Sequence, residues 1–162
     1  MNAQCDDGDI IKQIQISIEE EDTGARILEK YNKACPDLVS DVVRLINIGK
    51  FPTKRQDISK ATYFGKRTSE DGGIDWQKER IRNWVRVQAK PYPGAFSHIG
   101  KEKIIIHKIS YSDRGFIDTI INGSVIALID NKPIIKIPNG AITLEDYECK
   151  EIIEEGQILR TI

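Results

Sequence analysis

The chain changes its residue pattern near Lys103, and this change limits its possible folds more than any other feature. From there on, short runs of β-branched residues alternate with turn residues. Such runs predict strands, because β-branched side chains pack well on a pleated surface. Five short strands at this spacing indicate a small antiparallel barrel or sandwich, and an OB-like barrel is one natural closure. The predicted strands are 104–109, 116–121, 124–129, 134–137 and 141–144, separated by the turns Ser112-Asp113, Asn122-Gly123, Asp130-Asn131 and Asn139-Gly140.

The first fifty residues have a different pattern. Polar and apolar residues alternate within 8–18, which predicts a short strand with one buried face. Asp22 and Thr23 are good helix caps, and Pro36 either kinks the predicted helix that follows or starts its second segment. Apolar residues recur at helical spacing as far as Gly49, namely Leu28, Tyr31, Leu38, Val42, Leu45 and Ile46.

Between these two regions, residues 50–73 are polar and rich in glycine, with little periodicity, so we expect a connection there. Residues 77–88 form a second predicted amphipathic helix that buries Ile81, Trp84 and Val85. The expected class is therefore α+β.

Composition excludes few function classes. The formal net charge of −1 over 162 residues gives no bulk field that would recruit nucleic acid or anionic lipid. No apolar run approaches the roughly 20 residues needed to span a bilayer, and the acidic start lacks the layout of a signal peptide, so we expect a cytoplasmic protein without membrane contact. The spacing of Cys5, Cys35 and Cys149 indicates neither a disulfide framework nor a metal site.

Three carboxylates surround a glycine in Asp6-Asp7-Gly8-Asp9, directly before the first predicted strand. A tight turn at this place can aim one carboxylate into a site, where it orients a histidine or helps to accept a proton from an amine. A solvated acidic turn explains the same residues, and the residues alone leave both interpretations open.

The central stretch carries three motifs in a fixed order. They are Gly65-Lys66-Arg67-Thr68-Ser69-Glu70-Asp71-Gly72-Gly73-Ile74-Asp75-Trp76, then Asn83-Trp84-Val85-Arg86, then Pro91-Tyr92-Pro93-Gly94-Ala95-Phe96. In residue identity and spacing, these motifs resemble those of the formyltransferases that use 10-formyltetrahydrofolate. Ser69 replaces the usual proline of that pattern, and Val87 stands where alanine is common. The resemblance covers nearly the whole chain.

The resemblance implies transfer of a formyl group from 10-formyltetrahydrofolate to a primary amine. It places Asp6 as the catalytic carboxylate, since Asp6 stands two residues before Gly8 as in the family pattern. The family's Asn-x-His motif is absent, because neither His98 nor His107 follows an asparagine by two residues. We therefore expect 1–64 to be the end of an α/β formyltransferase domain, a remnant strand and helix plus the linker, and 65–162 to be its OB-like domain.

Two acceptors fit the resemblance. The residues of the motifs favour an amino sugar linked to a nucleotide. The basic residues Lys78, Arg82 and Arg86, at helical spacing, would instead suit the phosphates of an initiator methionyl-tRNA. A solvated helix face also explains that spacing. The candidate substrate-binding residues are Lys66, Arg67, Trp84, Arg86 and Tyr92.

A different class of function remains open, in which the chain is a non-catalytic OB-like interaction module. An incomplete first domain would leave apolar surface uncovered. We therefore expect self-association or pairing with a missing amino-terminal half.

Overall fold

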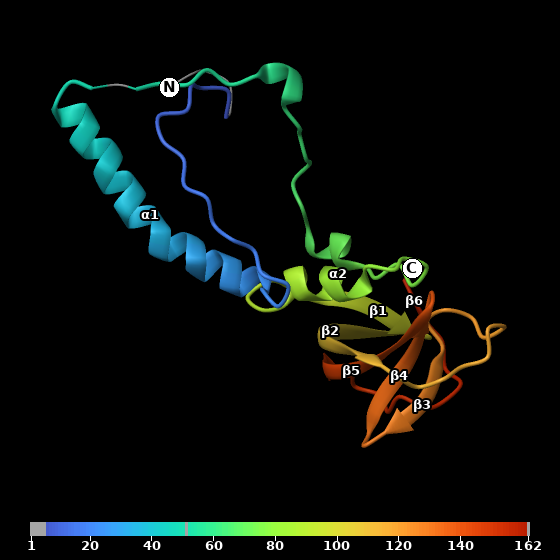
Figure 1. Cartoon of the computed structure of the whole chain (residues 1–162). Coiled ribbons are helices and arrows are strands. Elements are labelled where there is room, and N and C mark those ends of the chain that lie inside the picture. Colours follow the sequence, from blue (N-terminus) through green and yellow to red (C-terminus); the bar gives the residue numbers. More distant parts are fainter. Residues whose placement is uncertain (1–5, 51, 162) are drawn as a thin grey trace. The chain divides into compact units, whose positions relative to one another are not determined.

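The computed structural model of the chain describes residues 6–50 and 52–161 (Figure 1). Within them the chain divides into two compact units. The first unit holds residues 6–20 and 26–66, and the second holds residues 21–25 and 67–161.

The long helix α1, Gly24–Asn47, dominates the first unit. It continues through Pro36, so the proline neither ends the helix nor starts a separate one. A short 3-10 turn, η1, follows at Ile58–Lys60. None of the helices in the described ranges is both long and apolar enough to cross a membrane.

The predicted strand within 8–18 is wrong for most of its length. Only Ile10 pairs, in an antiparallel bridge with Lys54, and residues 11–18 have no regular structure. A strand is stable only with a hydrogen-bonded neighbour, and the alternating pattern of Ile14 and Ile18 cannot supply one. Both of these side chains are exposed, and they provide no buried face.

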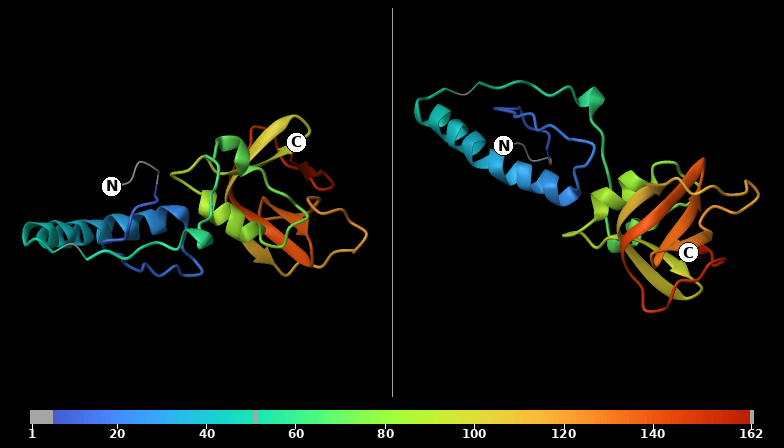
Figure 2. Two further views of the ribbon diagram at one scale, coloured as in Figure 1. Left: turned by 90° about the horizontal axis from the view of Figure 1, so that it is seen from above. Right: turned by 60° about the horizontal axis from the view of Figure 1, so that its bottom comes forward.

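The second unit is built around a six-stranded antiparallel sheet with the order β3-β4-β5-β2-β1-β6. The sheet curls strongly, which Figure 2 shows for the strands coloured yellow to red. Hydrogen bonds of 2.8 Å from the Val125 N–H to Gln157 O and from the Leu159 N–H to Gly123 O join the β3 edge to the chain around β6. The strands are β1 (Ala95–Ile99), β2 (Glu102–Ser112), β3 (Val125–Ile129), β4 (Lys132–Ile137), β5 (Gly140–Glu148) and β6 (Leu159–Arg160).

The turn residues correctly predicted the β3–β4 and β4–β5 hairpins, but not the β1–β2 hairpin, whose turn lies between Ile99 and Glu102. Asp130 and Asn131 have φ angles of 51° and 59°, the left-handed pair that a two-residue hairpin turn between β3 and β4 requires. Asn139 has φ 58° at the turn between β4 and β5. Asparagine and aspartate tolerate this conformation better than other side chains, which explains why the sequence identified these turns.

Other strand predictions failed. Residues 116–121 form a loop instead of a strand, and Ile117 and Ile121 are exposed. Two strands were not predicted from the sequence: β1, which begins at the end of the Pro91–Phe96 motif, and the two-residue β6. Helix α2 begins at Ile81 and ends at Gln88, so Lys78 precedes the helix and does not share a helical face with Arg82 and Arg86.

The core lies inside the curled sheet, where α2 covers it. Ile81 and Val85 of α2 are buried against strand residues, and the half-buried Trp84 packs beside them, close to the prediction for this helix. A polar chain also crosses the core. The Trp76 indole N–H donates to Ser97 Oγ at 2.9 Å, and the Ser97 hydroxyl donates to the Arg160 carbonyl oxygen at 3.0 Å.

Replacing Ser97 with alanine is expected to destabilise the protein by roughly 1–3 kcal/mol, because it leaves the buried Trp76 N–H and the Arg160 carbonyl without partners. Urea unfolding followed by tryptophan fluorescence measures this. Ser69→Ala, at an exposed position, is the matched control and should change stability by less than about 0.5 kcal/mol. Equal unfolding midpoints for the two variants would show that the polar chain contributes nothing.

Candidate functional site

The acidic turn at the start of the described chain is held by a distant glutamine. Gln56 Nε2 donates hydrogen bonds to the carbonyl oxygens of Asp6, at 2.9 Å, and Gly8, at 2.6 Å. Asp6 has φ 59°, and its side chain is exposed. Just beyond the turn, Ile10 and Lys54 exchange two backbone hydrogen bonds of 2.9 Å. These contacts fix the backbone that carries the Asp6 carboxylate while leaving the carboxylate itself open.

A groove of about 610 Å³ runs beside this turn within the first unit. Apolar side chains of α1 form one wall, among them Leu38, Val39 and Val42, and residues 8–13 form the other. Asp6 and Gln56 lie at its border. The groove therefore combines an apolar wall with a carboxylate, an arrangement suited to proton transfer beside an organic substrate.

The motif segment 67–76 folds into a compact turn before α2. In η2, Ser69–Gly72, the Asp71 carboxylate accepts a hydrogen bond of 2.6 Å from the Thr68 N–H and another of 3.1 Å from the Thr68 hydroxyl. The backbone hydrogen bond is the main reason that the pKa of Asp71 lies below its usual value. This capping box satisfies the free N–H groups at the start of the turn.

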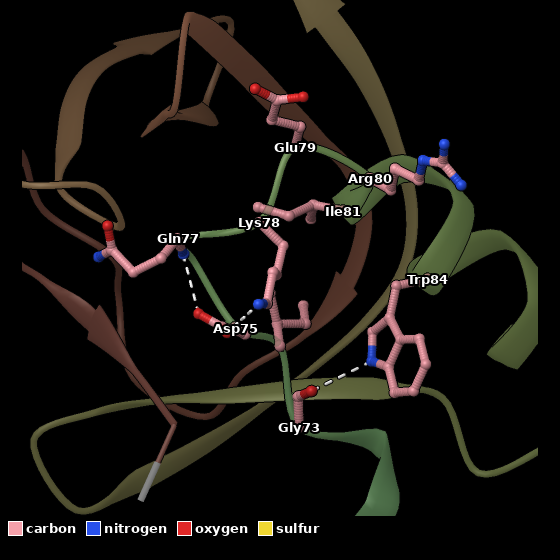
Figure 3. A pocket seen from close by; sticks show the side chains of 9 residues that line it. Gly73, Asp75, Gln77, Lys78, Glu79, Arg80, Ile81 and Trp84 are labelled. Carbon is pink, nitrogen blue, oxygen red and sulfur yellow. Dashed lines mark hydrogen bonds and ion pairs between the residues drawn. The ribbon is translucent and has the colours of Figure 1, made fainter.

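A cavity of about 660 Å³ lies between this segment and the start of α2 (Figure 3). Trp84 forms one wall and donates a hydrogen bond of 3.1 Å to the Gly73 carbonyl oxygen. Most of the lining surface is apolar, and its lining residues include the buried Ile74 and Ile81. Lys78 folds back toward Asp75 at 3.9 Å, so its ammonium group is already paired.

The structure does not bring the five predicted substrate-binding residues together. Arg67 stacks over Trp84, with 5.1 Å between the guanidinium carbon and the ring centre, and this is the one pair it unites. Arg86 is half-buried and lines a separate cavity. Tyr92 is 44% exposed and lies close to Gly24, and Lys66 is exposed in the linker. Whether these residues bind a substrate stays a prediction.

Sequence reasoning missed Gln56, which no local pattern marks as a partner of Asp6. It also missed the role of the motif glycines. A Cβ atom on Gly72 would lie 2.8 Å from the Gly94 carbonyl oxygen, and one on Gly94, which has φ 93°, would lie 2.6 Å from the Ile105 side chain. Gly72 therefore lets the motif segment approach the turn before β1 closely, and Gly94 lets that turn approach β2.

The fold and its motif segment define a class: a small domain with a curled antiparallel sheet, which the motif segment 67–76 and, earlier in the chain, a long helix precede. Residues 66–161 match the sequence model described as the formyl transferase C-terminal domain. The chain therefore belongs to the formyl transferase family.

Solved structures share the fold over 93% of this chain. A HypX variant from Aquifex aeolicus superposes with a TM-score of 0.63 at 16% identity, and HypX in complex with tetrahydrofolic acid with 0.61 at 17%. Methionyl-tRNA formyltransferase from Clostridium thermocellum superposes with 0.59 at 18%. This chain spans 27%, 26% and 53% of those three chains, respectively.

Removing the Gln56 amide should loosen the acidic turn. In Gln56→Ala we expect the amide protons of Ile10 and Lys54 to exchange with solvent about 5- to 30-fold faster, because the loss of two hydrogen bonds destabilises the local structure by roughly 1–2 kcal/mol. Amide hydrogen exchange by NMR measures both sites. Gln13→Ala, an exposed glutamine of the same groove, should leave the rates unchanged. Unchanged rates in Gln56→Ala would contradict the assigned role.

Proposed function

We propose that this chain provides the carboxyl-terminal portion of a formyltransferase that moves a formyl group from 10-formyltetrahydrofolate to a primary amine in the cytoplasm. Residues 1–64 would complete the catalytic domain and supply the linker, and residues 65–162 would form the OB-like domain. The family match over residues 66–161 supports the class. The observation that carries the catalytic part is the open Asp6 carboxylate on a backbone turn anchored by Gln56.

The proposed reaction joins the amine nitrogen to the formyl carbon and breaks the bond between that carbon and the folate nitrogen. Positive charge develops on the attacking nitrogen, and the nitrogen must lose a proton as the folate nitrogen gains one. A carboxylate beside the amine stabilises that charge and assists the proton transfer. Asp6 suits this role because its carboxylate is exposed beside the groove.

The remaining catalytic groups would come from a portion of the catalytic domain outside these 162 residues, since the Asn-x-His motif does not occur in them. The surface of the first unit supports this proposal. Helix α1 has 24 residues and a strong apolar face, yet none of its described residues is buried. Exposed apolar side chains in this unit include Ile11, Ile14, Ile18, Val39, Val43 and Ile46. A surface of this kind needs a covering partner, either the rest of the catalytic domain or a second copy.

For the acceptor we propose an amino sugar linked to a nucleotide, because the residues of the central motifs resemble those of the formyltransferases that act on such sugars. The tRNA alternative has support of its own, because one structure with this fold is a methionyl-tRNA formyltransferase. Two observations argue against a continuous phosphate-binding stripe for tRNA: Lys78 precedes α2, and Arg82 is paired with Glu21.

Asp6→Asn in the native polypeptide that contains this chain should lower kcat for formyl transfer by about 100-fold or more, because the amide cannot accept the proton. Asp7→Asn, in the same turn but outside the groove lining, is the matched control and should retain activity. The isolated 162-residue chain should turn over far more slowly than the roughly 10 per second of an ordinary enzyme. Full activity of Asp6→Asn would refute its catalytic role.

The acceptor is tested by the same assay with two amines. We expect formylation of a uridine or thymidine diphosphate amino sugar, with little dependence on salt. Preferential formylation of initiator methionyl-tRNA, with affinity falling steeply as salt rises, would overturn the sugar proposal in favour of tRNA. Transfer to neither amine by the native polypeptide would favour a non-catalytic module.

A further inference from the structure

A second cavity, of about 320 Å³, lies between α2 and β2 in the second unit, and basic side chains dominate its polar lining. It is separate from the cavity beside Trp84, because Trp84 and Arg86 are two residues apart on α2 and point to different sides. Four cationic side chains line it, Arg82, Arg86, Lys90 and Lys108, against the two carboxylates of Glu21 and Asp146. The lining thus carries an excess of positive charge.

An irregularity in β2 creates one wall of this cavity. The pairing of β2 with β5 shifts register on both sides of Lys108. As a result, Ile106 and Ile109 are both buried, although residues three positions apart in a regular strand face opposite sides. His107 and Lys108, which lie between them, both line the cavity. A regular strand would direct one of these two neighbours into the core. The bulge therefore places a ring nitrogen and an ammonium group next to each other facing α2.

Arg86 supplies the observation that points to a ligand. Its Nε and Nη1 atoms are shielded from solvent and have no hydrogen-bond partner among the described residues. The neighbouring groups are already engaged, since Arg82 pairs with Glu21, and both Lys90, at 3.5 Å, and His107 Nε2, at 2.9 Å, lie against Glu148. Shielded N–H groups without acceptors are costly, and such groups in native proteins usually meet a water or an ion.

We propose that this cavity binds a phosphate group, with Arg86 as its principal ligand and Lys108 as a second cation. A dianion matches the charge excess of the lining and offers several acceptor oxygens to the guanidinium N–H groups. The volume exceeds that of a phosphate alone, so a small phosphorylated molecule fits as well as inorganic phosphate. This site does not depend on formyl transfer.

Histidine NMR provides a local test on the intact chain, because it has only two histidines and only His107 lines the cavity. Inorganic phosphate or glycerol phosphate is titrated at fixed pH and constant ionic strength, with sodium chloride as the comparison. We expect the His107 imidazole signals to shift to saturation at millimolar phosphate, while those of His98 on β1 stay in place. If the monoester binds more tightly, the ligand is a phosphorylated molecule, and if inorganic phosphate does, it is the free ion.

Arg86→Met should weaken this binding by about tenfold or more, because it removes the N–H donors but keeps the length of the side chain. Arg80→Met, an exposed arginine at the start of α2, removes the same charge and should leave binding unchanged. The buried Trp76 indole N–H signal reports whether each variant is folded. Should Arg86→Met unfold, Arg86→Lys is expected to keep the fold and bind more weakly than the natural protein. The proposal is wrong if the natural chain gives no saturable His107 shift, if chloride reproduces it, or if Arg86→Met binds as well as Arg80→Met.

Discussion

The hydrogen-bonded chain from Trp76 through Ser97 to Arg160 connects three segments on which the second unit depends. Trp76 belongs to the motif segment 67–76, Ser97 to β1 and Arg160 to β6. Ser97 is fully buried, so its hydroxyl must both accept and donate without help from water. The motif segment is also held to β1 by the Ile74 N–H, which donates to the Phe96 carbonyl oxygen at 2.9 Å. The motif segment is therefore part of the domain core.

This arrangement explains why the motif residues indicate the family clearly but do not identify the acceptor. The residues on which the resemblance rests stabilise the fold. Gly72 and Gly94 permit a close backbone approach, Trp76 and Phe96 fill the core, and Asp71 caps the turn before α2. Residues of this kind report a shared fold more than a shared substrate.

Helix α2 separates two different surfaces. On one side Trp84, over which Arg67 stacks, lines a largely apolar cavity, and on the other Arg86 lines a basic one. The first unit shows a contrasting situation, because its long helix buries none of its described residues. A strong amphipathic pattern predicts such a helix correctly, but the pattern also requires a covering surface that these residues do not supply.

The sequence by itself determined the local features of this protein: the hairpin turns at Asp130-Asn131 and Asn139, the strands β3, β4 and β5, the apolar face of α2, and membership of the formyl transferase family. Each depends on neighbouring residues whose conformational preferences can be read directly. Only the tertiary structure decided that residues 116–121 form a loop, that Leu159–Arg160 becomes β6, that Gln56 holds the Asp6 turn, and that a bulge turns His107 and Lys108 toward Arg86. The last three features depend on hydrogen-bond partners that lie roughly 35 to 60 residues away, and no local pattern identifies a partner at that distance.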